Sequence, residues 1–143
     1  MQVEQIAVFL ENKSGRLAKI TSILAANDIN IRALSVADTA DFGILRLIVN
    51  HVGKAQEVLK KGGFTVSKTD VVAVAVPDRV GGLAEVLRAV TEGGYNVEYM
   101  YAYAHRADGS AVMIFRFDDM PGAVAMLKEK DFTLVSSHEI CAT

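Results

Sequence analysis

The stretch that decides the fold is residues 11–17, Glu-Asn-Lys-Ser-Gly-Arg-Leu, which an apolar helix pattern and then Asn30-Ile31 follow. The same order returns at an offset of 66 residues, where Asp78-Arg79-Val80-Gly81-Gly82-Leu83 precedes a second apolar pattern and Asn96-Val97. A glycine turn, a helix and an asparagine-led strand are therefore present twice.

The repeat continues to the end of the chain. Beyond the second predicted hairpin the offset becomes 68 residues, so that Phe132-Thr133-Leu134 matches Phe64-Thr65-Val66. The two extra residues fall in the hairpin at residues 105–110, where insertions are tolerated. Matches on both sides of one small insertion indicate a tandem repeat of a single structural unit.

Hydrophobic periodicity predicts the elements of each copy. In the first copy it predicts strands over residues 3–10, 29–37, 42–50 and 64–70, and helices over residues 17–27 and 53–61. In the second copy it predicts strands over residues 71–76, 96–104, 111–118 and 132–141, and helices over residues 83–90 and 121–130. Each copy has the order strand-helix-strand-strand-helix-strand.

This order predicts an α+β fold of two ferredoxin-like βαββαβ units in tandem, residues 1–70 and 71–143. Right-handed crossovers place both helices of a unit on one face of an antiparallel sheet. No flexible stretch separates the copies before Pro77, so we expect a direct and rigid join. Both faces of the predicted strands are largely apolar, and such sheets are normally covered on both sides. We expect the other repeat, a second chain, or both to cover the open face.

Composition excludes several classes of protein. The 143 residues are 51% hydrophobic, but no apolar run approaches the ~20 residues that a membrane helix needs. A single cysteine excludes an internal disulfide, and no secretory signal is visible at the N-terminus, so we expect a cytoplasmic protein. A net charge of −2 with interspersed signs argues against binding to nucleic acid through phosphates.

The repeated residues resemble the ACT domains, small ligand-binding regulatory units often attached to enzymes of amino-acid metabolism. The family pattern is a first strand, a turn Asn/Asp-x-Pro-Gly-x-Leu, a helix, and Asn-Ile at the start of the second strand. Residues 12–17 and Asn30-Ile31 fit it, and so do residues 78–83 and Asn96-Val97. Ser14 and Val80 replace the usual proline. The resemblance covers nearly the whole chain, in two copies.

The resemblance implies that a free amino acid or similar small molecule binds at an interface between two such units. A glycine at a helix start lets an anion approach backbone N–H groups that lack a helical partner, so the turn at Gly15, assisted by Arg16, suits a carboxylate. Asn12 and Asn30 suit the ammonium or side chain, and Asp78 would attract an ammonium more strongly than Asn12. We therefore expect two unequal sites. The candidate ligand-binding residues are Asn12, Ser14, Gly15, Arg16, Leu17, Asn30 and Ile31 in the first copy, and Asp78, Val80, Gly81, Gly82, Leu83, Asn96 and Val97 in the second.

The resulting hypothesis is a non-catalytic tandem ACT protein without a cofactor or metal. It senses a metabolite, forms a homodimer or higher homo-oligomer, and acts in trans, with an enzyme as a possible partner. No membrane or nucleic acid is expected as a partner. The three histidines and Cys141 show no metal-ligand spacing.

Plainer interpretations remain open. Gly15 and Gly81 can serve the turn alone, and Asn30 and Asn96 can simply follow a helix stop. A set of three tyrosines alternates along the predicted strand 96–104: Tyr99, Tyr101 and Tyr103. This tyrosine set would pack across an interface or line a ligand cavity there. At the level of function, the alternatives are a structural or interaction module without ligand, and an acylphosphatase-like small hydrolase that uses the Gly15 turn and Arg16.

Overall fold

The computed structural model describes residues 3–11, 13–38, 41–103 and 110–141. The described chain forms two compact units, for the most part Glu4–Thr69 (the N-terminal unit) and Asp70–Ile140 (the C-terminal unit). The domain bounds 1–70 and 71–143 stay a prediction. The predicted hairpin at residues 105–110 lies outside the described residues except for Ser110. No helix among the described residues is long and apolar enough to cross a membrane.

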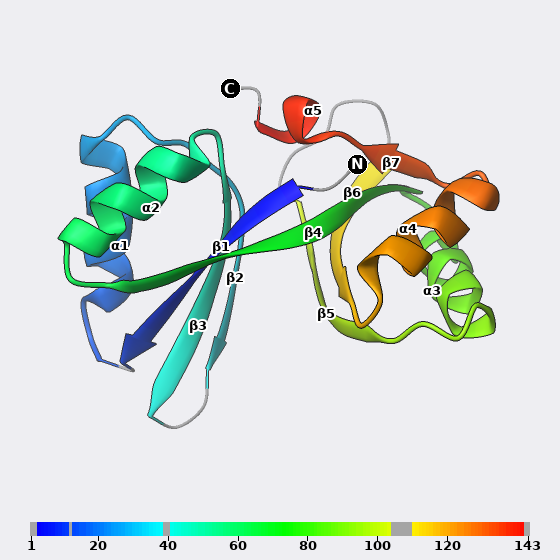
Figure 1. Ribbon diagram of the computed structural model, residues 1–143, viewed down its shortest axis with the longest axis horizontal. Helices are drawn as coiled ribbons and strands as arrows, with labels where there is room; N and C mark the ends of the chain where they lie inside the picture. The colour runs from blue at the N-terminus through cyan, green and yellow to red at the C-terminus, as the bar shows by residue number, and fades with distance from the viewer. Residues whose placement is uncertain (1–2, 12, 39–40, 104–109, 142–143) are drawn as a thin grey trace. The chain divides into compact units, whose positions relative to one another are not determined.

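The N-terminal unit has the predicted order of elements (Figure 1). They are β1 (Val3–Glu11), α1 (Arg16–Ala26), β2 (Ile31–Asp38), β3 (Phe42–Val49), α2 (Val52–Lys61) and the first part of β4 (Thr65–Pro77). The strands lie in the order β2-β3-β1-β4, and β3 pairs antiparallel with both β1 and β2. This is the ferredoxin-like arrangement, in which the third strand lies beside the first.

The C-terminal unit repeats the arrangement (Figure 1). Its elements are the second part of β4, α3 (Gly82–Glu92), β5 (Val97–Ala102), β6 (Ser110–Phe117), α4 (Met120–Glu129), β7 (Thr133–Val135) and α5 (Ser137–Cys141). The strand β6 lies between β4 and β5, and β7 pairs antiparallel with β4. Pro121 lies in the first turn of α4, as predicted, and Asp119 caps that helix by accepting a hydrogen bond from the N–H of Gly122 at 3.1 Å.

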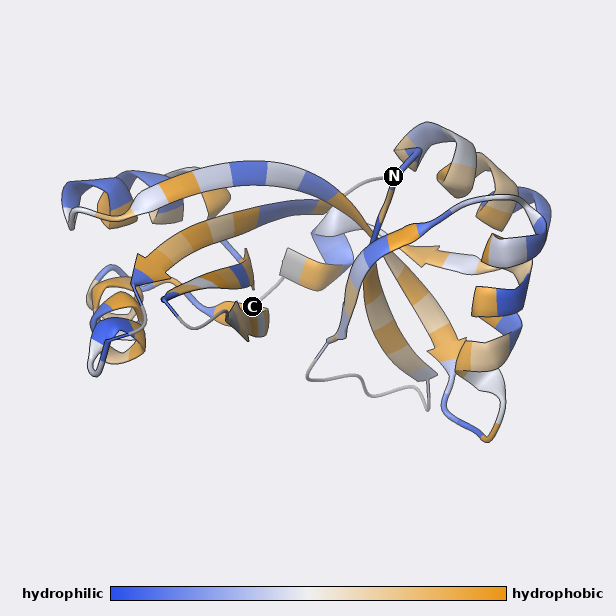
Figure 2. Ribbon diagram, turned by 90° about the horizontal axis from the view of Figure 1, so that it is seen from below, coloured by the Kyte–Doolittle hydropathy of each residue, from blue (hydrophilic) through white to orange (hydrophobic). Residues whose placement is uncertain are grey.

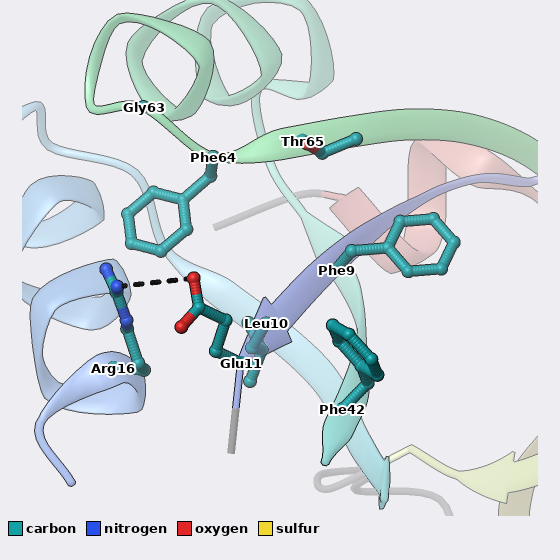
Figure 3. A pocket seen from close by; sticks show the side chains of 8 residues that line it. All are labelled: Phe9, Leu10, Glu11, Arg16, Phe42, Gly63, Phe64 and Thr65. Carbon is teal, nitrogen blue, oxygen red and sulfur yellow. Dashed lines mark ion pairs between the residues drawn. The ribbon is translucent and has the colours of Figure 1, made fainter. Parts of the chain in front are cut away.

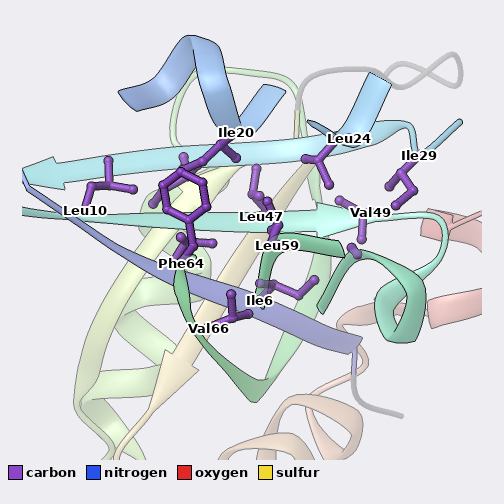
Figure 4. Packing of buried hydrophobic residues seen from close by; sticks show 13 residues of the cluster. Ile6, Leu10, Ile20, Leu24, Ile29, Leu47, Val49, Leu59, Phe64 and Val66 are labelled. Carbon is purple, nitrogen blue, oxygen red and sulfur yellow. The ribbon is translucent and has the colours of Figure 1, made fainter. Parts of the chain in front are cut away.

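One face of each sheet is buried under its two helices. In the N-terminal unit, Ile20 and Leu24 of α1 and Leu59 of α2 pack against the strand residues that alternate toward them (Figure 4). The packed strand residues are Ile6, Val8, Leu10, Leu45, Leu47, Val49 and Val66. Hydrophobic residues accordingly gather along the strands and on one side of each helix (Figure 2). In the C-terminal unit, Val86, Val90 and Leu127 pack in the same way on Val72, Val74, Phe115 and Phe117.

Two exposed aromatic residues mark the other face of the N-terminal sheet. Phe9 is 50% exposed and Phe42 is 61% exposed. Leu34 and Val36, which pair with Leu47 and Leu45 and so lie on the helix side, are also about half exposed because β2 is the last strand of the sheet. The predicted covering of the open face by another repeat or chain stays a prediction.

The two copies meet within a single strand. Residues Thr65–Pro77 form one 13-residue strand, β4, instead of the two strands predicted at 64–70 and 71–76. The backbone stays extended across the boundary between the copies, and the rigidity of their join stays a prediction. The polar residues Ser67–Asp70 interrupt the apolar pattern and suggested a boundary between two strands, but the strand continues through them.

The last predicted strand, residues 132–141, is wrong beyond Val135. Residues Ser137–Cys141 form the short helix α5. The N–H of Glu139 donates to the side-chain oxygen of Ser136 at 3.2 Å, so Ser136 caps this helix. Ser136 and Glu139 have the spacing of a capping box, a local signal that alternating hydrophobicity obscured.

Gly82 provides a test of the close packing at the start of α3. A side-chain carbon at Gly82 would collide with the carbonyl oxygen of Pro77. We expect Gly82→Ala to lower the free energy of unfolding by about 1–3 kcal/mol, the usual cost of overpacking. The matched control is Gly53→Ala in α2, where an added carbon meets nothing within 4 Å and the unfolding free energy should be unchanged or slightly higher. Urea unfolding measures both, and equal effects in the two variants would contradict this account.

Candidate ligand-binding site

Each unit begins its first helix with a left-handed glycine. Gly15 has φ 87° and precedes α1, and Gly81 has φ 88° and precedes α3. A side-chain carbon at either glycine would meet nothing within 4 Å, so the backbone conformation and not lack of space requires glycine there. No side chain caps either helix. The turn at Gly15 therefore presents an uncapped helix start, which suits an anion.

Some N–H groups of the two glycine turns form hydrogen bonds within the turn itself. The N–H of Arg16 donates to the carbonyl of Lys13 at 3.4 Å, and the N–H of Gly82 donates to the carbonyl of Arg79 at 3.1 Å. The next N–H groups of α1, on Leu17 and Ala18, have no acceptor within the helix because of their position in the first turn. They are the backbone donors that a bound carboxylate could reach.

The other predicted residues of the turns differ in exposure. Ser14, Asp78 and Val80 are exposed, and Val80 is fully so. Leu17, expected on the buried face of its helix, is 43% exposed, because the core contact of α1 begins one turn later at Ile20. Gly82 is buried, and Leu83 packs against the core of its unit. Asn12 lies outside the described residues.

Asn30 and Asn96, which follow the first helix of each unit, form hydrogen bonds through their backbone groups. The N–H of Asn30 donates to Oδ1 of Asn50 at 2.9 Å, and the N–H of Asn50 returns a bond to the carbonyl of Asn30 at 3.2 Å. Asn96 and Asp118 form the same pair of bonds, at 2.9 and 3.1 Å. The exposed side chains of Asn30 and Asn96 are not used in these bonds, and Ile31 and Val97 follow them at the starts of β2 and β5.

Asn50 and Asp118 are therefore structural partners that sequence reasoning missed. They match each other at the offset of 68 residues and accept the same backbone N–H in each unit. The repeat could have revealed them, because two short polar residues with a side-chain oxygen occur at equivalent positions. The bonds explain the position of Asn30 and Asn96 without a ligand.

Within one unit, the glycine turn and the asparagine lie at opposite ends of the same helix. The helix α1 has 11 residues, so its ends are about 16 Å apart. One amino-acid residue spans only about 4 Å. A single amino acid therefore cannot contact Gly15 and Asn30 of the same unit, and a site that uses both needs residues from two units.

A cavity of about 220 Å³ adjoins the first turn of α1 in the N-terminal unit (Figure 3). Four parts of the unit meet there: the end of β1, the start of α1, the start of β3, and the loop from α2 into β4. The lining residues are Phe9, Leu10, Glu11, Arg16, Phe42, Gly63, Phe64 and Thr65. Of these, sequence reasoning selected only Arg16, because the others lie far apart in the chain or look like ordinary strand residues.

Charges of both signs lie at this cavity. Nζ of Lys13 is 2.7 Å from one carboxylate oxygen of Glu11, and Nη2 of Arg16 is 3.8 Å from the other (Figure 3). Nζ of Lys19 lies 5.6 Å from the centre of the Phe64 ring. The hydrogen bond from Lys13, with the charges of Lys13 and Arg16, holds the pKa of Glu11 below its usual value. Two cations, Lys13 and Arg16, therefore flank the ionised carboxylate of Glu11.

The equivalent turn of the C-terminal unit has a different chemistry. Pro77 stands in the place of Glu11, and Gly82 stands in the place of Arg16. Arg79 pairs instead with Glu85 on α3, Nη2 to Oε1, at 2.9 Å. The two turns thus share a backbone conformation but not their charged groups.

A second hollow lies at the opposite end of α1. It is a groove of about 560 Å³ lined by Ala25, Asp28, Ile29, Asn30, Asn50 and His51. The described residues contain no cluster of histidine, cysteine and acidic side chains that could hold a metal ion. Of the tyrosine set, Tyr101 is buried and Tyr99 and Tyr103 are half-buried, and their role at an interface or cavity stays a prediction.

The sequence and the fold of this chain are similar to those of known proteins. The family described as "ACT domain pair" matches residues 1–142. No curated protein matches the sequence. Among solved structures, protein BT0572 from Bacteroides thetaiotaomicron is 40% identical with a TM-score of 0.93, over 100% of this chain and 98% of that one. The regulatory subunit of aspartate kinase from Thermus thermophilus, in a ligand-free form, is 17% identical with a TM-score of 0.61, over 90% of this chain and 92% of that one. This second likeness shows the fold alone.

The bonds of Asn50 and Asp118 can be tested by substitution. Asn50→Ala and Asp118→Ala each remove the side-chain oxygen that accepts a backbone N–H, which should cost about 0.5–1.5 kcal/mol of unfolding free energy. Asn50→Asp and Asp118→Asn keep an oxygen at the same position and serve as controls. Urea unfolding that shows the controls as unstable as the alanine variants would contradict the assigned role.

The charge environment of Glu11 can be tested by NMR titration of its carboxyl carbon. We expect its pKa to lie below the ordinary value of 4.5, so that its bond to Lys13 persists as the pH falls through that value and is lost only at the lowered pKa. Lys13→Met should move the pKa upward, because it removes both the hydrogen bond and the nearer cation. Lys61→Met, which removes a lysine paired with Glu57, is the control and should leave it unchanged.

Proposed function

Because the chain belongs to the ACT domain family and contains a pair of these domains, we propose that it is a non-catalytic regulatory protein that binds a free amino acid. ACT domains are amino-acid-binding regulatory domains, and the family match spans residues 1–142. The proposal places the protein in the cytoplasm, acting in trans on an enzyme partner as a homo-oligomer.

The observation that carries the proposal is the turn at Gly15. Its left-handed backbone brings the chain to the start of α1 without a capping side chain, and the space beside the glycine is open. A carboxylate there would accept hydrogen bonds from the N–H groups of Leu17 and Ala18, at the positive end of the helix dipole. Every α-amino acid carries such a carboxylate, so the turn supports recognition of the part that all of them share.

The regulatory part of the proposal requires that ligand binding favours one state of the assembly. Since Gly15 and Asn30 lie at opposite ends of α1, a ligand that touched both would join two units. Occupancy would then stabilise the contact between those units. Coupling of about 1–3 kcal/mol is typical of allosteric proteins and is enough to change the fraction of assembled protein severalfold.

Thermal unfolding with each of the twenty amino acids at millimolar concentration tests ligand binding. We expect one or a few to raise the melting temperature, because a ligand at 100 times its Kd stabilises the folded state by about 2.7 kcal/mol. Gly15→Ala should abolish the response through backbone strain at the turn. Gly94→Ala is the matched control, since Gly94 also has a positive φ (80°) and open space but lies at the end of α3. If no amino acid raised the melting temperature, the chain would instead be a structural or interaction module.

A further inference from the structure

We propose that the cavity at Glu11, Arg16 and Phe64 selects an α-amino acid with an uncharged, apolar side chain. This inference rests on the proposed function and names its ligand class. Arg16, together with the N–H groups of Leu17 and Ala18, binds the α-carboxylate, Glu11 binds the α-ammonium, and the aromatic residues of the cavity receive the side chain. The cavity forms within the N-terminal unit alone.

The spacing of the two charged groups suits a zwitterion. Nη2 of Arg16 is 3.8 Å from the Glu11 carboxylate, which is longer than the 2.7–3.2 Å of a direct hydrogen bond. The guanidinium has five N–H donors in a planar fork that matches a carboxylate. An incoming ligand can therefore place its carboxylate on Arg16 and its ammonium on Glu11 without first breaking a close bond between them.

The surrounding charges favour this orientation. Lys13, Arg16 and Lys19 outnumber the single carboxylate of Glu11. The negative end of the ligand is therefore drawn toward the start of α1, and Glu11 is the one acidic group that lines the cavity. Glu11 stays ionised through its contact with Lys13, so it can accept a hydrogen bond from an ammonium at neutral pH.

The rest of the lining fits an apolar side chain. Phe9, Phe42 and Phe64 all line the cavity. Phe9 and Phe42 lie on the open face of the sheet, where 50% and 61% of them are exposed, and Phe64 lies on the helix side of β1 (Figure 3). An apolar ligand group would remove this aromatic surface from water, which is favourable. Among the described residues, the lining holds no third charged side chain that could pair with a charged ligand side chain.

The size of the cavity limits the ligand. Its volume of about 220 Å³ lies below the ~300–1,000 Å³ of sites for drug-sized molecules. One amino acid matches this scale, whereas a nucleotide does not.

The C-terminal unit lacks four of the residues of this site, although Phe132 matches Phe64. Ala75, Pro77, Gly82 and Ser110 stand in the places of Phe9, Glu11, Arg16 and Phe42. The C-terminal turn therefore has no counterpart of the Glu11 and Arg16 pair or of the exposed side chains of Phe9 and Phe42. We therefore expect one such binding site in each chain.

Isothermal titration calorimetry with leucine, methionine and phenylalanine tests the inference against aspartate and lysine. We expect the apolar amino acids to bind at least tenfold more tightly than the charged ones, with one site per chain. The 2-oxo acid of leucine separates the two charged contacts, because it keeps the carboxylate and lacks the ammonium. Glu11→Gln should weaken leucine at least tenfold and leave the 2-oxo acid unchanged, and Arg16→Gln should weaken both.

Two further variants complete the design. Phe42→Ser should reduce the preference for apolar side chains, and its exposed position makes it compatible with folding. Arg79→Gln breaks the exposed ion pair of the C-terminal unit and is the matched control, with unchanged binding expected.

The outcomes separate this inference from the proposed function. Tight binding of aspartate or lysine, or binding of leucine that neither Glu11→Gln nor Arg16→Gln weakens, would overturn the inference and leave amino-acid binding intact. Absence of binding by all twenty amino acids would overturn both. Two equivalent sites per chain would also overturn it, because only the N-terminal unit has the required groups.

Discussion

The structure depends on the reversal of the chain between the first strand and the first helix of each unit. The helix must return over the sheet it has just left, so that Ile20 and Leu24 reach the strand residues facing them. Gly15 and Gly81 make this possible by adopting a left-handed backbone that other residues adopt only with strain. The same reversal leaves the helix start uncapped and exposed. One backbone constraint thus serves both the packing of the core and the candidate site.

Two copies of one fold have diverged in chemistry. The buried residues that hold the helices on the sheet are equivalent in the two units, since Leu24 and Val90 occupy matching positions. The exposed residues beside the glycine turns are not, because Glu11 and Arg16 are replaced by Pro77 and Gly82. Core residues are constrained by close packing, where a change of one methylene group is felt. Residues at the turns have no such constraint, so differences between copies accumulate there.

Local patterns predicted most of the elements and failed at identifiable places. Alternating hydrophobicity predicted a strand to residue 141, but the Ser136 cap turns the chain into α5 after Val135. Helical spacing placed Leu17 on the buried face, but 43% of it is exposed, because the buried residues of α1 begin at Ile20. The asparagine pattern selected Asn30 and Asn96 and missed Asn50 and Asp118, which bind their N–H groups from 20 and 22 residues away in the chain. In each case the structure depended on a specific hydrogen bond or on the residue at which packing begins. Hydrophobic periodicity indicates neither of these.

The amino-acid sequence by itself determined the repeat, the ferredoxin-like order of elements, and the glycine at the start of each first helix. These are local properties, set by side-chain periodicity and by the backbone freedom of glycine. Only the tertiary structure decided that Glu11, Arg16 and Phe64 line one cavity. The physical reason is that Phe64 reaches Glu11 through the packing of α2 and β4 on the sheet, across more than 50 residues of chain. The spacing of residues along the sequence does not indicate that Phe64 and Glu11 lie close together.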